Sequence, residues 1–186
     1  MRNAFFKFFT GREGDTSGRA DGDLKAQLVA AYGTNKRGGV DTAKAAKSLG
    51  VSQRAVNYWL QGRYKPNTDH RKTIATKSRQ AATTKRGRQR LADFARKQPA
   101  AKNKAPQIYV MGLQGPRNAQ NEYLRHRITN LWQNLSQNDI NDFIDVWAEG
   151  GEDAALDWLQ NAFSTGYLDE WGFKSIDSIS FQDPRL

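Results

Sequence analysis

The sequence predicts a mainly helical chain of the α+β class, with an N-terminal helical domain, a basic arm and a small acidic α+β module at the C-terminal end. Three observations predict this organisation. Two short helical patterns are joined by a single glycine within residues 49–67. The last third of the chain has helix-spaced apolar residues between two strand-like segments. Positive and negative charges are concentrated in different parts of the chain.

The charge distribution favours two modules with separate roles. The chain has 186 residues and a formal net charge of +10, from 29 Lys and Arg against 19 Asp and Glu. Residues 61–104 hold 14 basic residues and two aspartates, whereas residues 131–186 hold 2 basic and 11 acidic residues. A basic excess of this size indicates a polyanionic partner, with nucleic acid preferred over an acidic membrane.

Composition also excludes several classes of chemistry. The chain has no cysteine, which excludes disulfides and thiolate catalysis, and its two histidines argue against a structural zinc site. No apolar run approaches the roughly 20 residues that cross a bilayer, and the start, MRNAFFKFF, lacks the features of a signal peptide. We therefore expect a cytoplasmic protein with no cofactor, no metal and no membrane partner.

The first 67 residues predict three helices after an aromatic segment and a loop. Residues 1–22 begin with phenylalanines that we expect to pack on the body of the protein or on a partner, and continue as a polar, glycine-containing loop. Asp23 is suited to cap a helix that ends at Gly33. Two more helices are predicted over residues 42–48 and 53–61. Residues 23–67 thus form the first predicted domain.

Residues 68–104 form the predicted basic arm and linker. The part up to residue 98 is rich in Ala, Thr, Lys and Arg and poor in large apolar residues. Two interpretations remain open. The arm is either a basic helix anchored by Ile74, Leu91 and Phe94, or an unfolded basic tail that becomes ordered on DNA.

Residues 105–186 predict the small acidic α+β module, which we expect to mediate association. The segment QIYVM (107–111) has the length and composition of a strand, and the apolar residues from Tyr123 to Leu135 predict a helix. Ser136 and Asp139 form a capping box before a second helix, and a third helix follows two glycines. The alternating segment FKSIDSISF (173–181) predicts a strand beside residues 107–111.

The stretch LGVSQRAVNYWLQGRYKPN (49–67), with the helix before it, fits a helix-turn-helix. Small residues stand where the first helix crosses the second, a glycine stands in the turn, and apolar residues occupy the inward positions. These residues are Ala45, Ala46, Gly50, Val51, Val56 and Trp59. Every constrained position of the motif is therefore filled by a compatible residue.

The outward face of the second helix carries side chains suited to DNA. Gln and Asn pair with adenine, Arg pairs with guanine, and a serine cap leaves the helix N-terminus facing a phosphate. The residues that we predict to face the groove are Ser52, Gln53, Arg54, Asn57 and Tyr58. The predicted phosphate contacts are Lys44, Lys47, Arg63, Lys65, Arg71, Lys72, Lys85, Arg86, Arg88 and Arg90. For Tyr58, packing on the preceding helix is the alternative.

This stretch resembles the second and third helices of many bacterial repressor-type DNA-binding domains. Small residues in the first helix, the turn glycine and a Val-Ser start of the recognition helix recur in those families. The resemblance covers roughly residues 23–67. It implies that the outward residues of the second helix face the major groove of double-stranded DNA.

Over nearly its whole length the chain also resembles the terminal proteins of linear Streptomyces chromosomes and plasmids. The likeness lies in the short N-terminal segment, the helix-turn-helix, the basic region RQAATTKRGR (79–88) and the acidic module that ends in a strand. It implies binding to telomeric DNA, covalent joining to the 5′ end through a hydroxyl, and priming of end synthesis.

One departure bears on that covalent step. The family attaches DNA through a threonine in the central region, but residues 85–128 contain no serine or threonine. The candidate hydroxyls are therefore Tyr109 and Tyr123, with Thr83 and Thr84 just upstream. Both tyrosines lie in apolar patterns, where we expect core residues.

Three hypotheses follow. The first is a non-enzymatic, sequence-specific DNA-binding protein of the bacterial nucleoid or of a plasmid, acting in regulation or replicon maintenance as a homodimer or with another protein. The second is a terminal protein that caps and primes linear DNA. The third is a multimer that coats DNA and is assembled by the acidic module. Acidic clusters at 139/142/145 and 149/152/153 have helical spacing and predict a solvated face rather than a metal-dependent nuclease site.

Overall fold

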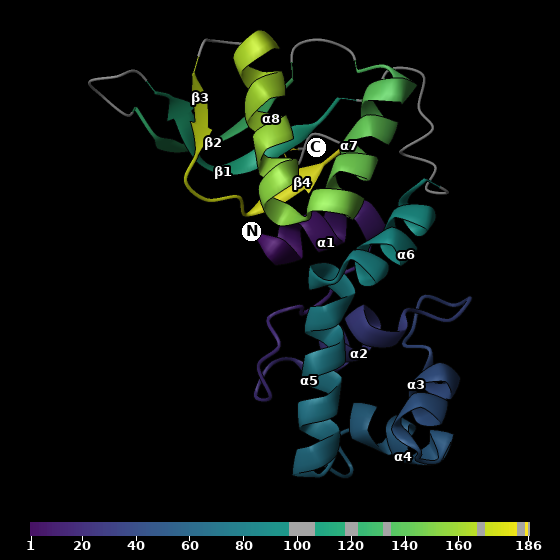
Figure 1. Ribbon diagram of the computed structural model, residues 1–186. Helices are drawn as coiled ribbons and strands as arrows, with labels where there is room; N and C mark the ends of the chain where they lie inside the picture. The colour runs from purple at the N-terminus through teal and green to yellow at the C-terminus, as the bar shows by residue number, and fades with distance from the viewer. Residues whose placement is uncertain (97–106, 118–122, 132–134, 167–169, 182–184, 186) are drawn as a thin grey trace. The chain divides into compact units, whose positions relative to one another are not determined.

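The computed structural model describes residues 1–96, 107–117, 123–131, 135–166, 170–181 and 185. The fold is mixed α+β, and it divides into two compact units. Residues 12–87 form a helical unit, and residues 1–11 with 88–186 form a sheet unit. The helices are α1 (Arg2–Thr10), α2 (Leu24–Tyr32), α3 (Thr42–Leu49), α4 (Gln53–Leu60), α5 (Thr68–Thr83), α6 (Lys85–Ala95), α7 (Gln137–Gly150) and α8 (Glu152–Gly166), and the strands are β1 (Tyr109–Pro116), β2 (Arg125–Asn130), β3 (Trp171–Phe173) and β4 (Ser178–Ser180) (Figure 1).

This division differs from the predicted boundaries at residues 22, 67 and 104. The N-terminal helix α1 belongs to the sheet unit, together with α7 and α8. The predicted basic arm is split, because α5 belongs to the helical unit and most of α6 belongs to the sheet unit. The predicted linker at 98–106 lies outside the described residues.

Side-chain caps begin four of the helices in the helical unit. Asp23 accepts a hydrogen bond from the backbone N–H of Ala26 at 2.7 Å, and Ser52 accepts one from Ala55 at 3.1 Å. Asp41 and Asn67 cap α3 and α5 in the same way. These bonds satisfy N–H groups that have no partner within the helix. The three predicted helices of residues 23–61 are confirmed, and two of them begin at the predicted caps, Asp23 and Ser52.

The core of the helical unit brings one residue from each helix to the same place. Leu28 of α2, Ala45 of α3, Val56 of α4 and Ile74 of α5 are fully buried in one cluster. Helix α5 also contacts α2 along its length. Of the two interpretations of the basic arm, residues 68–95 therefore follow the helical one, with Ile74 as its anchor in this unit.

The loop before α2 is held by buried polar contacts. Residues 12–22 contain no helix or strand, as predicted. The buried side chain of Gln27 donates to the carboxylate of Asp15 and to the carbonyl of Arg19. Arg71 of α5 donates to the carbonyls of Ala20 and Gly22, both at 2.7 Å. Arg71 therefore holds this loop on the helices, which corrects its assignment as a phosphate contact.

The sheet unit contains an antiparallel sheet in which β1 pairs with all three other strands. The order is β2-β1-β3, and β4 pairs with the other end of β1 through Val110 and Ile179. The strand predicted over residues 173–181 is confirmed in part, because β4 covers residues 178–180 and pairs with residues 109–111, whereas residue 173 ends β3 and residues 174–177 form no strand. In Figure 1, α7 and α8 lie side by side over the sheet.

The predicted helix from Tyr123 to Leu135 is wrong for its described part. Residues 125–130 form β2, which pairs with β1 from Tyr109↔Asn130 to Gln114↔Arg125. Leu124 and Ile128 are four residues apart, and this spacing keeps two side chains on one face in a strand as well as in a helix. The apolar pattern therefore did not separate the two structures. Trp132 lies outside the described residues.

Aromatic stacking joins α1 to α7 in the core of the sheet unit. Phe9 stacks on Trp147 with ring centroids 4.2 Å apart, and Phe8 lies 5.6 Å from Phe143. Phe5, Phe9, Phe143 and Trp147 are each at most 2% exposed. The N-terminal phenylalanines therefore pack on the body of the protein, which is one of the two predicted outcomes.

The acidic residues of α7 have structural partners. Asp139 forms the predicted capping box with Ser136, and these hydrogen bonds lower the pKa of the Asp139 carboxyl. Asp142 accepts a hydrogen bond from the indole of Trp158 at 2.7 Å, and Asp145 pairs with Arg96. The cluster at 139/142/145 therefore connects α7 to its own N-terminus, to α8 and to α6.

Arg88 is buried in the sheet unit, which corrects its assignment as a phosphate contact. It is 8% exposed, and its guanidinium donates to the carbonyls of Ala148 and Glu149 at 3.2 and 2.7 Å. Those carbonyls belong to the last turn of α7 and have no partner within the helix. Arg88 thus caps the C-terminus of α7.

We predict that Arg88→Ala lowers the free energy of unfolding by about 1–3 kcal/mol, because two carbonyls at the end of α7 lose a charged donor. The matched control is Arg90→Ala, since Arg90 lies on the same helix and is exposed. It is expected to change stability by at most about 0.5 kcal/mol. Urea unfolding followed by tryptophan fluorescence measures both, and equal effects would contradict the capping role of Arg88.

A second prediction concerns pH. Asp139→Ala is expected to cost about 1 kcal/mol near neutral pH through loss of the capping box. The pKa of Asp139 is lowered in the folded state, so its stabilisation is present above the unfolded pKa of about 4 and is lost as the pH falls through the folded pKa. The stability difference from wild type should therefore shrink in acid. Asp157→Ala, at an exposed position of α8, is the control for a general charge effect. If the difference in unfolding free energy between wild type and Asp139→Ala stays constant with pH, the capping role of the ionised Asp139 is refuted.

Candidate nucleic-acid interface

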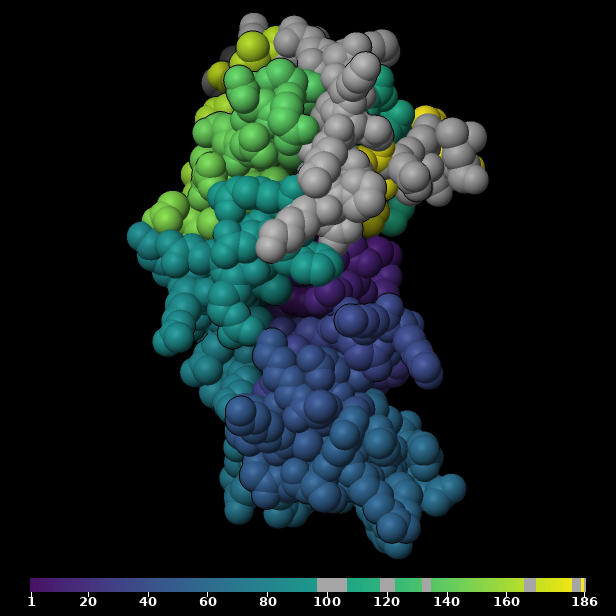
Figure 2. Space-filling model, turned by 90° about the vertical axis from the view of Figure 1, so that its right-hand side faces the viewer, coloured from purple at the N-terminus to yellow at the C-terminus, as the bar shows by residue number. Residues whose placement is uncertain are grey.

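Helix α4 presents one polar face to solvent. Val56 is fully buried, whereas Gln53, Arg54 and Asn57 are exposed and Tyr58 is half-buried. The surface that α3 and α4 form, blue in the space-filling view, is open to solvent on the side shown in Figure 2. The structure therefore places the predicted groove-facing residues together on one exposed surface.

The N-terminal ends of α3 and α4 meet at a side-chain hydrogen bond. The amide nitrogen Nε2 of Gln53 donates to Oγ1 of Thr42 at 2.8 Å. Gly50, between the two helices, has a φ of 69°, in the left-handed region that glycine adopts without strain. The glycine turn and this bond fix how α4 follows α3.

Two arginines and two tyrosines form a cluster on the exposed side of α4. The Nε of Arg54 donates to the hydroxyl of Tyr58 at 2.6 Å, and the guanidinium carbon of Arg54 lies 5.1 Å from the centre of the Tyr58 ring. Arg63 lies 5.2 Å from the same ring centre. The ring of Tyr64 lies 5.6 Å from that of Tyr58. One ring thus orients two guanidinium groups through cation–π contacts.

This cluster modifies the predicted role of Tyr58 and adds a residue. The Tyr58 hydroxyl is bonded to Arg54, so Tyr58 positions an arginine. Tyr64 was not among the predicted site residues, although it is 65% exposed. The sequence signal for it was the aromatic residue between two basic ones in Arg63-Tyr64-Lys65.

The remaining predicted cations fall into two groups. Exposed side chains in the helical unit are those of Lys44, Lys47, Arg63, Lys65, Lys72, Lys85 and Arg86. Arg90 is exposed but belongs to the sheet unit. Arg71 and Arg88 donate to backbone carbonyls, so we no longer count them among the predicted phosphate contacts.

The four candidate hydroxyls have different surroundings. Thr83 and Thr84 are exposed, and each donates to a carbonyl of α5, at 3.0 and 2.8 Å. Tyr109 is half-buried, and its hydroxyl donates to Gln107. Tyr123 is 55% exposed, which contradicts the expectation that it lies in the core.

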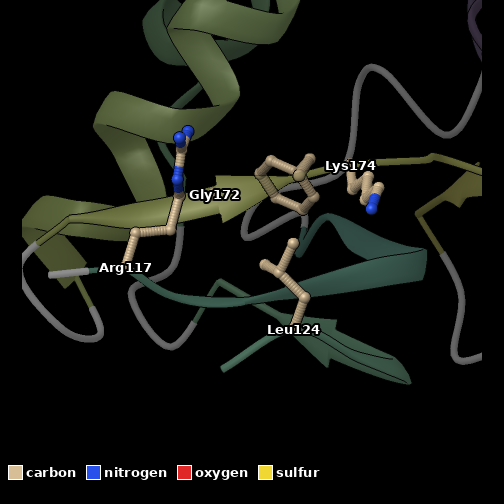
Figure 3. A pocket seen from close by; sticks show the side chains of 5 residues that line it. Arg117, Leu124, Gly172 and Lys174 are labelled. Carbon is tan, nitrogen blue, oxygen red and sulfur yellow. The ribbon is translucent and has the colours of Figure 1, made fainter. Parts of the chain in front are cut away.

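The sheet unit has a small cavity beside β3. Its volume is about 250 Å³, and in Figure 3 Arg117 extends across the strand near Gly172 while Leu124 points toward the strand from its other side. Gly172, Phe173 and Lys174 complete the described lining. Among the described residues that line it, none has a carboxylate, imidazole or hydroxyl for acid–base chemistry.

The described residues provide neither a metal-binding cluster nor a membrane-spanning helix. Within this part of the chain, no group of three or more His, Asp or Glu side chains is placed to hold a metal ion. No helix in it is long and apolar enough to cross a membrane.

Comparison with protein-family models, with curated proteins and with solved structures found no match to this chain. A function is therefore inferred from the geometry and the surface chemistry of the chain itself.

Proposed function

We propose that the chain is a sequence-specific double-stranded DNA-binding protein, in which α3 and α4 form a helix-turn-helix and α4 is the recognition helix. The observation that carries the proposal is the polar face of α4, on which Gln53, Arg54 and Asn57 are exposed while Val56 is buried. A recognition helix needs this arrangement, because its core side fixes the helix and its outer side contacts base edges.

Charge on the helical unit supports this function. From residue 24 to residue 68 the sequence holds eight Lys and Arg and a single acidic residue, Asp41. The carboxylate of Asp41 caps α3 by accepting from the N–H of Lys44 at 3.0 Å. Over the whole helical unit, residues 12–87, 16 Lys and Arg stand against six acidic residues, so the unit carries the net positive charge that favours binding to the phosphate backbone.

The cluster around Tyr58 holds the side chain of Arg54 in position before any partner binds. In the proposed complex Arg54 donates two hydrogen bonds to a guanine edge, and Asn57 or Gln53 pairs with adenine. Arg54 is already held by the hydroxyl and ring of Tyr58, so it loses less conformational freedom on binding. Lys44, Lys47, Arg63 and Lys65 bind phosphates and set the register of the helix in the groove.

The biological role that we propose is transcriptional regulation or replicon maintenance. In this scheme the sheet unit, which includes the acidic segment 131–186, contacts a second copy of the chain or another protein. Such pairing places two recognition helices on two half-sites.

The first test of this function is the double variant Arg54→Ala/Asn57→Ala. Each bidentate base contact contributes about 1–3 kcal/mol of discrimination, so the preference for a duplex selected from a random library over a scrambled duplex should fall tenfold or more. Fluorescence anisotropy at fixed salt measures both affinities.

The matched control for that test is Lys44→Ala/Lys47→Ala. It removes two predicted phosphate contacts and should weaken binding to the selected and the scrambled duplex by the same factor. If the first double variant keeps the full preference of the wild type, α4 is not the reading element.

A second candidate function is covalent attachment to the end of linear DNA, and the exposure of Tyr123 favours it. In that reaction the phenol oxygen attacks the α-phosphorus of a nucleotide, the bond to pyrophosphate breaks, and the phenol proton is lost. The expected product is a phosphodiester between Tyr123 and the first nucleotide. A polymerase partner would supply the nucleotide and its metal ions.

Intact mass measurement of protein purified from its native host and treated with nuclease tests this candidate. A residual nucleotide adduct that is absent from Tyr123→Phe assigns the linkage to that phenol. An adduct that persists in this variant moves the linkage to another hydroxyl, and an unmodified wild-type mass eliminates covalent attachment.

A further inference from the structure

The connection between α2 and α3 is a closed hairpin. Thr34 and Val40 form an antiparallel bridge, and the N–H of Asn35 donates to the carbonyl of Gly39 at 2.7 Å. This connection projects outward from the helices in Figure 1. It was a simple basic turn in the sequence, and none of its residues was among the predicted site residues.

The side chain of Asn35 holds the tip of the hairpin in one conformation. Its Oδ1 accepts hydrogen bonds from the N–H of Arg37 at 2.9 Å and of Gly39 at 3.2 Å. Gly38 has a φ of 80°, in the left-handed region. The backbone of the tip is thus fixed before any partner binds.

The two residues at the tip are cations with no acidic neighbour. Lys36 and Arg37 are both exposed. In the described structure neither of their side chains forms an ion pair, and the nearest acidic residue in the sequence, Asp41, is occupied as the cap of α3. A fixed pair of unneutralised cations is suited to bind an extended polyanion.

The hairpin leads directly into α3, whose first residue contacts the start of the proposed recognition helix α4. Two residues after Val40, Thr42 accepts the hydrogen bond from Gln53 at the first turn of α4. Arg37 is five residues before Thr42, a separation of at most about 18 Å for an extended chain. The major groove is about 12 Å wide, so this upper limit on the separation is of the same order as the distance from the groove to the phosphates along its rim.

We propose that the hairpin of residues 34–40 is a second DNA contact, in which Lys36 and Arg37 bind phosphate oxygens beside the groove that α4 enters. The inference rests on the proposed function of α4 and adds a second, phosphate-binding contact to it. Phosphate contacts carry no base information, so the hairpin contributes affinity and register. Because its backbone is already fixed, little conformational entropy is lost on binding.

The test is the salt dependence of DNA binding by full-length Lys36→Gln/Arg37→Gln. Each phosphate contact contributes about 0.9 to the slope of log affinity against log salt, so the slope should fall by about 1.8. Between about 50 and 200 mM salt, the affinity of the wild type should therefore fall by a factor roughly twelve times larger than that of the variant. The preference for the selected over the scrambled duplex should stay unchanged.

Lys174→Gln/Arg125→Gln is the matched control, because it removes the same charge from exposed positions of the sheet unit. It should leave the slope at the wild-type value. Gly38→Ala provides a second variant that keeps both cations but strains the tip, since an alanine at this φ is disfavoured. It should lower affinity for both duplexes by the same factor while the melting temperature of the chain changes little.

The outcomes separate the two proposals. If wild-type protein prefers its selected duplex but Lys36→Gln/Arg37→Gln has the same slope as wild type, the hairpin is not on DNA and the role of α4 stands. The proposed role of the hairpin is also refuted if Lys36→Gln/Arg37→Gln changes the sequence preference without changing the salt slope. If wild-type protein shows no preference for any duplex, the proposed function of α4 is refuted, and so is the proposed DNA contact of the hairpin.

Discussion

The burial of Val56 is the constraint on which the exposed surface of α4 depends. It is the only fully buried side chain of that eight-residue helix, and it packs in a cluster with residues of α2, α3 and α5. Successive residues of a helix are about 100° apart, so fixing Val56 inward directs Arg54, two residues earlier, to the opposite side of the helix and turns Asn57 away from the core. Core packing and the orientation of the exposed face of α4 therefore depend on the same side chain. A helix this short has little stability of its own, so its orientation comes from this core.

Acidic residues have structural partners in both units. In the helical unit, Asp23 and Asp41 cap α2 and α3. In the sheet unit, Asp139, Asp142 and Asp145 stabilise α7 and its contacts. The units differ in their balance of charge, since residues 12–87 hold 16 Lys and Arg against six acidic residues, whereas residues 1–11 and 88–186 hold 13 of each. The uneven charge of the sequence therefore corresponds to the division into two units.

Features set by local sequence were predictable, and features set by distant contacts were not. The caps Asp23 and Ser52, the turn at Gly50 and the capping box of α7 depend on residues three or four apart, and the sequence identified them. One distant pairing, that of β4 with β1, is an exception, because the composition of both segments already indicated strands. Arg88 was misassigned because its partners, Ala148 and Glu149, are some sixty residues away. No local signal distinguishes such an arginine from an exposed one.

The candidate site shows the same limit. The outward residues of α4 followed from helical periodicity, but the cluster of Arg54, Tyr58 and Arg63 required the path of the chain after α4 to be known. The hairpin of residues 34–40 had only a basic turn as its signal, since its closure depends on the Thr34–Val40 bridge and on the side chain of Asn35. Helix α1 was placed by aromatic stacking on α7, across more than 130 residues of sequence.

Amide chemical-shift mapping of the isotope-labelled full-length chain, titrated with its selected DNA duplex, tests the role of α4 most directly. We predict that the largest shifts occur at residues 52–58 and that residues of the β-sheet change little. Shifts confined to residues 107–181, or an unchanged spectrum for α4 under saturating duplex, would contradict the assignment of α4 as the helix that reads DNA.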